Sequence, residues 1–208
     1  MNEMEKIAQL KVVPVVKIDD INDTRPLMQA LVNGGLPVAE ITFRTACAAD
    51  AIKLASTEFP EMLVGAGTVI NAEQAERAVE AGAKFIVGPG WADDVAAFCR
   101  DRGVLYLPGC VTPSEIIKAL SNGISLVKFF PASVYGGLKA IKALAAPFTG
   151  VKFVPTGGVS ADNLAEFLAF DKIVACGGSW MVADKLVKEG KFDEIERLTR
   201  EAVAIANK

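Results

Sequence analysis

The segment VAEITFRT, residues 38–45, alternates apolar and polar side chains with the period of a β-strand. Glu40, Thr42 and Arg44 share one parity, so a strand here presents a carboxylate, a hydroxyl and a guanidinium on one face. A charged residue in a strand usually marks an edge or a solvent-facing position. However, helices cover both faces of a parallel sheet in α/β proteins, where an unpaired charge is costly. The pattern therefore favours a strand whose polar face lines a shared interior, as in a barrel.

Short apolar segments rich in β-branched residues recur along the chain and alternate with segments of helical periodicity. These apolar segments are Val12–Ile18, Val38–Phe43, Met62–Thr68, Phe85–Pro89, Val104–Pro108, Leu126–Pro131, Lys152–Thr156 and Ile173–Gly177. Between them, Asn71–Ala81 is typical, because its small apolar residues share one helical face. Asn71, Thr112 and Ser160 stand where helix N-caps are expected.

Eight strand–helix units predict a (β/α)₈ TIM barrel, an α/β fold, as a compact single domain over residues 1–208 with a short N-terminal helix. Phe192–Ala206 spaces its apolar residues along one face, which predicts a helix on the outer ring. An open doubly wound sheet is the structural alternative. It is disfavoured because no G-x-G-x-x-G pattern follows the first apolar segment, which reads VVPVVKIDD.

The amino-acid composition limits which residue types can carry out catalysis. The chain is 51% hydrophobic and 23% charged, and it contains no histidine, so proton transfer must use carboxylates, lysine, tyrosine, cysteine or water. None of the four cysteines forms a C-x-x-C pair, so neither a zinc ribbon nor a thioredoxin motif is present. The N-terminus lacks an apolar signal core, and the net charge is −3 without a basic run. We therefore expect a cytoplasmic protein that binds neither nucleic acid nor membranes.

The segment LVKFFPA, residues 126–132, places Lys128 among apolar and aromatic residues such as Phe130. Burial favours the neutral form of an amine, and a neutral lysine attacks a ketone to form a Schiff base. The iminium then accepts electrons as the adjacent C–C bond breaks. Glu40 is the leading candidate for proton transfer, and Arg44 offers a bidentate fork for a substrate carboxylate. The alternatives are a solvent-facing lysine and an ion-pair cluster that only stabilises the fold.

Glycine clusters follow the last two apolar segments. Gly157 and Gly158 come after the seventh segment, and Gly177, Gly178 and Ser179 come at the end of the eighth. TIM barrels often bind phosphate at the loops after these two strands, through backbone amides. Turn formation alone would explain either pair, but two pairs at both expected places favour a phosphate site.

Seven short blocks of sequence form a specific combination. They are EITFRT at 40–45, GAGTV at 65–69, PG at 89–90, PGCVTPSE at 108–115, KFFPA at 128–132, PTGGV at 155–159 and GGSW at 177–180. At these residues the chain resembles the class I 2-keto-3-deoxy-6-phosphogluconate (KDPG) aldolases, a family that includes 4-hydroxy-2-oxoglutarate (KHG) aldolases. The blocks come in the family's order and span nearly the whole chain.

The resemblance implies that Lys128 is the Schiff-base lysine and Glu40 the acid/base. It implies that Arg44 and Thr68 bind the pyruvate carboxylate and that Thr156 influences stereochemistry. The substrate-binding residues expected on this basis, phosphate ligands included, are Arg44, Thr68, Pro89, Phe130, Thr156, Gly157, Gly158, Gly178, Ser179 and Lys17.

The resemblance further implies a lyase of the Entner–Doudoroff pathway. The family reaction is the reversible cleavage of KDPG to pyruvate and D-glyceraldehyde 3-phosphate, and a related reaction splits KHG into pyruvate and glyoxylate. Family members are typically homotrimers and need no metal or other cofactor.

Three positions depart from the usual family pattern and leave the substrate open. Ser133 stands where many relatives carry Glu, Gly88 where Ser is common, and Lys17 where several relatives have Arg. Lys17 is also compatible with a surface lysine extended into solvent. Cleavage of the galactonate epimer is therefore an alternative. The departures leave the lysine chemistry itself unchanged. Two further alternatives stand apart from them: a phosphate-binding barrel isomerase or synthase, which explains the glycine pairs but gives Lys128 no role, and a non-catalytic phosphosugar-binding or engineered assembly subunit.

Overall fold

The computed structural model describes residues 1–208, the whole chain. Its strands are β1 (Val12–Val16), β2 (Val38–Thr42), β3 (Leu63–Gly67), β4 (Phe85–Val87), β5 (Leu105–Leu107), β6 (Leu126–Phe129), β7 (Lys152–Pro155) and β8 (Cys176–Gly178). Its α-helices are α1 (Glu3–Leu10), α2 (Thr24–Asn33), α3 (Ala48–Glu58), α4 (Ala72–Glu80), α5 (Asp93–Arg102), α6 (Pro113–Ser121), α7 (Gly137–Ala145), α8 (Leu164–Leu168), α9 (Asp184–Lys188) and α10 (Phe192–Ala206). Two short 3₁₀ helices, η1 (Ile21–Asp23) and η2 (Trp180–Val182), complete the order.

The predicted alternation of strands and helices is confirmed, including the short N-terminal helix α1. Every predicted apolar segment contains or overlaps a strand, and α10 has the bounds predicted for the last helix. The largest difference is at Ile173–Gly177, where β8 begins only at Cys176.

Two of the three predicted helix N-caps are confirmed. The side chains of Asn71 and Thr112 each accept a hydrogen bond from a backbone N–H in the first turn, of α4 and α6 respectively. The prediction for Ser160 is wrong, because α8 starts later and its N-cap position is Asn163. The Asn163 side chain instead accepts from the Ser160 N–H and donates to the Gly158 carbonyl, both at 2.9 Å.

All strand pairings are parallel, as predicted, but they do not form one continuous eight-stranded sheet. The strands pair as a six-stranded sheet, β5-β4-β3-β2-β1-β8, and a two-stranded sheet, β6-β7. Isolated bridges link the two sheets at both junctions, namely Gly109 to Lys128, Phe153 to Ile173, and Thr156 to Gly177. The predicted parallel α/β architecture is therefore confirmed, while the expected continuous ladder is interrupted at two places.

The junction between β7 and β8 shows why the ladder is interrupted there. Phe153 bridges Ile173, and Thr156 bridges Gly177, so the β8 side has one residue more than the β7 side. An extra residue on one strand breaks the regular hydrogen-bond pattern locally, as in a β-bulge. Alternating polarity does not reveal such an insertion, which explains the error in the predicted start of β8.

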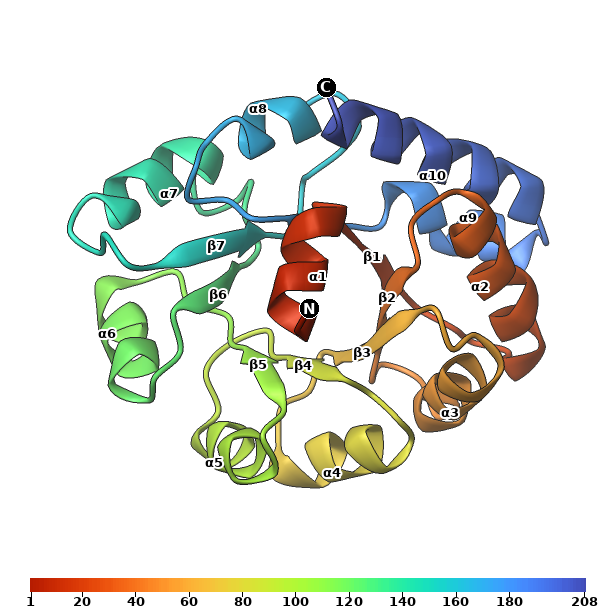
Figure 1. Ribbon diagram of the computed structural model, residues 1–208, viewed down its shortest axis with the longest axis horizontal. Helices are drawn as coiled ribbons and strands as arrows, with labels where there is room; N and C mark the ends of the chain where they lie inside the picture. The colour runs from red at the N-terminus through yellow and green to blue at the C-terminus, as the bar shows by residue number, and fades with distance from the viewer.

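Figure 1 shows the strands arranged around a centre, with helices α2 to α10 on the outside. Helix α1 lies over the centre in this view, and its Ile7 is fully buried. Met4 of α1 lines a hollow together with Leu105 and Leu126, the first residues of β5 and β6. Helix α1 therefore lies at the N-terminal end of the strands, which leaves their C-terminal ends open. No helix is long and apolar enough to cross a membrane.

One buried hydroxyl in this fold lacks a partner and provides a test of the packing. Thr24 at the start of α2 is fully buried, and its Oγ1 makes no hydrogen bond. Thr24→Val replaces this hydroxyl with a methyl group of similar shape. We expect the free energy of unfolding to rise by about 1 kcal/mol, because an unsatisfied polar group is removed. Chemical denaturation monitored by circular dichroism measures this change.

Thr199→Val is the matched control for this prediction. Thr199 of α10 is equally buried, but its hydroxyl donates to the Ile195 carbonyl at 2.7 Å. Its replacement should lower the free energy of unfolding by about 1 kcal/mol. A loss of stability in both variants would contradict the assignment of Thr24 as unsatisfied.

Candidate active site

An ion pair between Lys128 of β6 and Glu40 of β2 lies inside the ring of strands. The Lys128 Nζ is 3.2 Å from the Glu40 Oε1, and the two side chains are 7% and 4% exposed. They are the only charged residues of the chain that are buried. A lone buried charge is strongly destabilising, whereas two opposite charges in contact compensate each other. The structure therefore brings together the two residues predicted to be catalytic.

Glycine in the neighbouring strand gives the Glu40 side chain its space. Gly67 of β3 pairs with Thr42, two residues along β2 from Glu40. A Cβ atom at position 67 would lie 2.6 Å from the Glu40 Cγ and closer still to Oε1. No side chain other than hydrogen fits there while Glu40 keeps its position. Sequence reasoning quoted Gly67 only as part of a motif and did not identify this role.

Arg44 is held at the rim by the strand that precedes it. Its Nε donates to the Thr42 Oγ1 at 3.1 Å, and the Thr42 hydroxyl donates to the Val16 carbonyl of β1 at 2.9 Å. Thr42 is buried, while Arg44 is exposed. This chain of hydrogen bonds fixes the base of the guanidinium and leaves its outer nitrogens free for a ligand. The parity of residues 38–45 pointed to Thr42, but not to this positioning role.

A cavity of about 160 Å³ opens beside the ion pair at the C-terminal ends of the strands. Its lining residues are Val15, Arg44, Phe130, Thr156, Gly157, Gly158, Val159, Gly178 and Ser179. Seven of these nine were predicted to bind substrate, and Val15 and Val159 were not. The Phe130 ring links the cavity to the ion pair, since the Lys128 Nζ lies 5.1 Å from its centre.

One end of this cavity is built from backbone N–H groups without acceptors. The N–H groups of Gly157, Gly158 and Ser179 make no hydrogen bond within the chain. Gly157 and Gly158 have φ values of 90° and 82°, a region that favours glycine. Asn163 holds this loop in place through its bond to the Gly158 carbonyl. Several free N–H groups around one hollow are suited to binding an anion.

Three of the residues predicted to bind substrate do not line this cavity. Thr68, at the end of β3, is partly exposed and has a φ of 57°, which is unusual for a β-branched residue. Such strained backbone clusters at functional sites, so it fits a role near Glu40. Pro89 is partly buried, and its carbonyl lies close to Gly109. Lys17 lines a separate hollow and pairs with Asp19.

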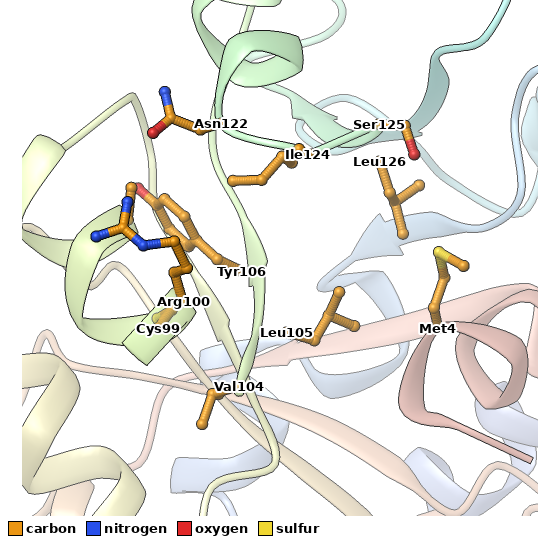
Figure 2. A pocket seen from close by; sticks show the side chains of 12 residues that line it. Met4, Cys99, Arg100, Val104, Leu105, Tyr106, Asn122, Ile124, Ser125 and Leu126 are labelled. Atoms are coloured by element: carbon orange, nitrogen blue, oxygen red, sulfur yellow. The ribbon is translucent and has the colours of Figure 1, made fainter. Parts of the chain in front are cut away.

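A larger hollow of about 320 Å³ lies at the other end of the strands and contains none of the predicted site residues. Figure 2 shows it between Met4 of α1, Leu105 of β5 and Leu126 of β6, with Arg100 at its side. Its only charged lining residue is Arg100, which is exposed and pairs with the neighbouring Asp101. Chemistry, rather than size, therefore identifies the cavity beside Lys128 as the candidate active site.

The two cysteines near strand ends carry no catalytic charge. Burial raises the pKa of the Cys110 and Cys176 thiols to about 12. Both therefore stay protonated near neutral pH, and a thiol is a far weaker nucleophile than a thiolate. Neither Cys110 nor Cys176 is therefore a candidate nucleophile.

Comparisons with known proteins agree with this geometry. The family model described as KDPG and KHG aldolase matches residues 4–198. A 2-dehydro-3-deoxy-phosphogluconate aldolase of Treponema pallidum is 45% identical over 97% of this chain and 96% of its own length.

Two solved structures are similar over nearly their whole length. The KDPG aldolase of Legionella pneumophila, with pyruvate captured as a covalent carbinolamine intermediate, has a TM-score of 0.93 and 35% identity and covers 97% of this chain and 98% of its own. The KDPG aldolase of Zymomonas mobilis ZM4 with 3-phosphoglycerate has a TM-score of 0.91 and 39% identity, with 98% and 96% covered. Together with the family match, these likenesses show that the chain belongs to the KDPG and KHG aldolase family.

Proposed function

We propose that this chain is a class I aldolase that reversibly cleaves KDPG to pyruvate and D-glyceraldehyde 3-phosphate through a Schiff base on Lys128. The buried contact between Lys128 and Glu40 is the observation that supports this proposal most. It places an amine beside a proton acceptor, next to a cavity with a guanidinium and an amide-lined end. The Legionella relative was captured with pyruvate as a covalent carbinolamine intermediate, which is an intermediate on the way to a Schiff base.

The reaction begins with transfer of a proton from the Lys128 ammonium to Glu40, which leaves a neutral amine. The amine nitrogen attacks the C2 carbonyl of the substrate and forms a carbinolamine. Glu40 returns a proton to the C2 oxygen, which leaves as water, and a protonated imine remains. The close contact of Nζ and Oε1 lets one carboxylate serve both proton transfers.

Cleavage then uses the imine as an electron sink. The C4 hydroxyl gives its proton to Glu40 through a water molecule, and the C3–C4 bond breaks to release an aldehyde. The electron pair of that bond moves into the imine and gives an enamine on Lys128. Protonation of the enamine at C3, followed by hydrolysis, frees pyruvate and the Lys128 amine.

The two ends of the cavity fit the two ends of the substrate. Arg44, with Thr68, binds the carboxylate beside the reacting carbon through charge-assisted hydrogen bonds. The free N–H groups of Gly157, Gly158 and Ser179 bind the phosphate. Thr156 lies between these ends and contacts the carbon whose configuration distinguishes gluconate-derived from galactonate-derived substrates. The 3-phosphoglycerate bound to the Zymomonas relative is also a phosphorylated acid.

KHG is the second candidate substrate, because the same imine chemistry cleaves it to pyruvate and glyoxylate. The amide-lined end offers neutral donors, which accept a carboxylate as well as a phosphate. The description of the matching family model names both activities. In both reactions the eight parallel strands act as one closed barrel around Lys128, and no cofactor other than the lysine itself takes part.

Borohydride reduction in the presence of pyruvate tests the proposed Schiff base. Reduction should trap one pyruvate per chain, and peptide mass mapping should place it on Lys128. Lys128→Ala should lose the adduct and lower kcat by about 10³-fold or more, with an unchanged circular dichroism spectrum. Lys139→Ala, which changes an exposed lysine, serves as the control and should keep both the adduct on Lys128 and the native kcat. An adduct elsewhere, or none, would refute the proposal.

Gly67→Ala tests whether the position of Glu40 matters for catalysis. The added methyl group must push the carboxylate away from Lys128, so we expect kcat to fall by about 10- to 100-fold with little change in KM. Glu40→Asp in the same chain shortens the carboxylate and should restore part of kcat. Gly150→Ala is the control, because a Cβ there meets nothing within 4 Å. Steady-state kinetics that leave kcat of Gly67→Ala at the native level would contradict this role.

We propose a homotrimer as the assembly, as the family resemblance implies. Ile70, Val134 and Tyr135 are more than half exposed and are large apolar residues available to an interface. Sedimentation equilibrium should give three times the mass of the chain. A monomer or dimer at micromolar concentration would contradict this assembly.

A further inference from the structure

A cluster of charged residues surrounds Lys17 beyond the end of β1. The Lys17 Nζ lies 2.8 Å from the Asp19 carboxylate and 3.9 Å from the Asp184 Oδ2 at the start of α9. Lys188 of the same helix lies 3.1 Å from Asp19. Asp23 completes the hollow that these residues line. The cluster holds three carboxylates and two ammonium groups, so its net charge is negative.

Lys17 follows β1 at the same end of the strands as the active-site cavity. It shares parity with Val15, which lines that cavity, and follows it toward the C-terminal end of β1. Strand β1 pairs with β8 so that Pro14 stands opposite Gly178, and Ser179 comes next. Lys17 and the anion-binding Ser179 therefore lie beyond the same ends of two neighbouring strands.

Despite this position, Lys17 does not line the cavity. Arg44 is the only charged residue that does, and its partner there is the carboxylate end of the substrate. The phosphate end consists of neutral donors alone. Lys17, which directly follows β1, is a candidate to supply a cation there, but it is occupied by Asp19 and Asp184.

The competition for Lys17 is between Asp19 and a bound phosphate. Hydrogen bonds from Lys17 and Lys188 hold the pKa of the Asp19 carboxyl below its ordinary value, so Asp19 is charged whenever the enzyme works near neutral pH. An exposed ion pair of this kind contributes too little to be needed for the fold. The same modest energy is enough to change the preference between two substrates several-fold.

We propose that Asp19 is a specificity-determining residue that holds Lys17 away from the phosphate end of the active site. By doing so it lowers the preference for phosphorylated over non-phosphorylated substrates. This inference rests on the proposed aldolase function and concerns only the phosphate end of the site. Asp184 assists Asp19 at longer range.

The test compares two substrates that differ only in the phosphate, KDPG and 2-keto-3-deoxygluconate. Asp19→Asn removes the nearer of the two carboxylates that hold Lys17, and it should raise the ratio of their kcat/KM values by about two- to five-fold at low ionic strength, the range that an exposed ion pair supports. The gain should lie in KM for KDPG and should largely disappear at about 1 M salt, where surface charges are screened.

Two variants separate the contact from a general change of charge. Asp23→Asn removes a carboxylate from the same hollow but breaks no ion pair with Lys17, so it should change the ratio by less than half as much. Lys17→Met should have little effect on the ratio in the native chain but should cancel the gain in the Asp19→Asn chain.

Three outcomes would overturn the inference. They are an unchanged or lower ratio in Asp19→Asn, an equal gain in Asp23→Asn, and a loss from Lys17→Met that is as large in the native chain as in Asp19→Asn. Borohydride trapping of pyruvate on Lys128 does not involve the phosphate end. An adduct with an unchanged ratio would therefore overturn this inference alone, whereas no adduct would overturn the proposed function as well.

Discussion

The contact between Lys128 and Glu40 is the constraint on which the rest of the structure depends, because both charges are buried and neither is stable there without the other. The two residues come from β2 and β6, which belong to different sheets. The strands must therefore surround a common interior for the pair to form. Burial of the pair also removes water from the amine, and this is the environment in which a lysine can act as a nucleophile. The architecture and the proposed chemistry thus depend on the same contact.

Glycines inside strands show how the interior makes room for functional side chains. Gly67 leaves space for Glu40, and Gly177 of β8 lies so close to Thr156 that a Cβ there would meet its side chain. Glycine weakens a strand because it costs more backbone entropy and packs nothing. In both strands the glycine stands where the side chain of a candidate site residue extends from the neighbouring strand, so the space it leaves outweighs its cost in stability. Gly67 and Gly177 are therefore required by the side chain of a residue on the neighbouring strand, and not by the conformation of their own backbone.

Much of this could be predicted from sequence because strand parity and burial act locally. The parity of residues 38–45 and the apolar surround of Lys128 were enough to place Glu40, Arg44 and Lys128 around one interior. Contacts between distant segments could not be predicted in this way. The insertion before Gly177 and the contact of Lys188 with Asp19 both depend on which strands and helices meet in space. Asn163 was missed for a different reason, because its partner Gly158 lies in a nearby loop and not in a periodic element.

The two ends of the cavity offer different physical means of holding an anion. Arg44 supplies a full charge, but its guanidinium is exposed and anchored only through Thr42, so it can adjust to the carboxylate during the reaction. The opposite end supplies backbone N–H groups whose positions are set by Gly157, Gly158 and Asn163, and these donors need no rearrangement to bind. The neutral end is rigid and the charged end is adjustable, and this difference suits the two parts of the proposed substrate. In the proposed reaction the reacting carbon lies next to the charged end, where the electron distribution changes, while the distant end only has to hold the substrate in register with Lys128.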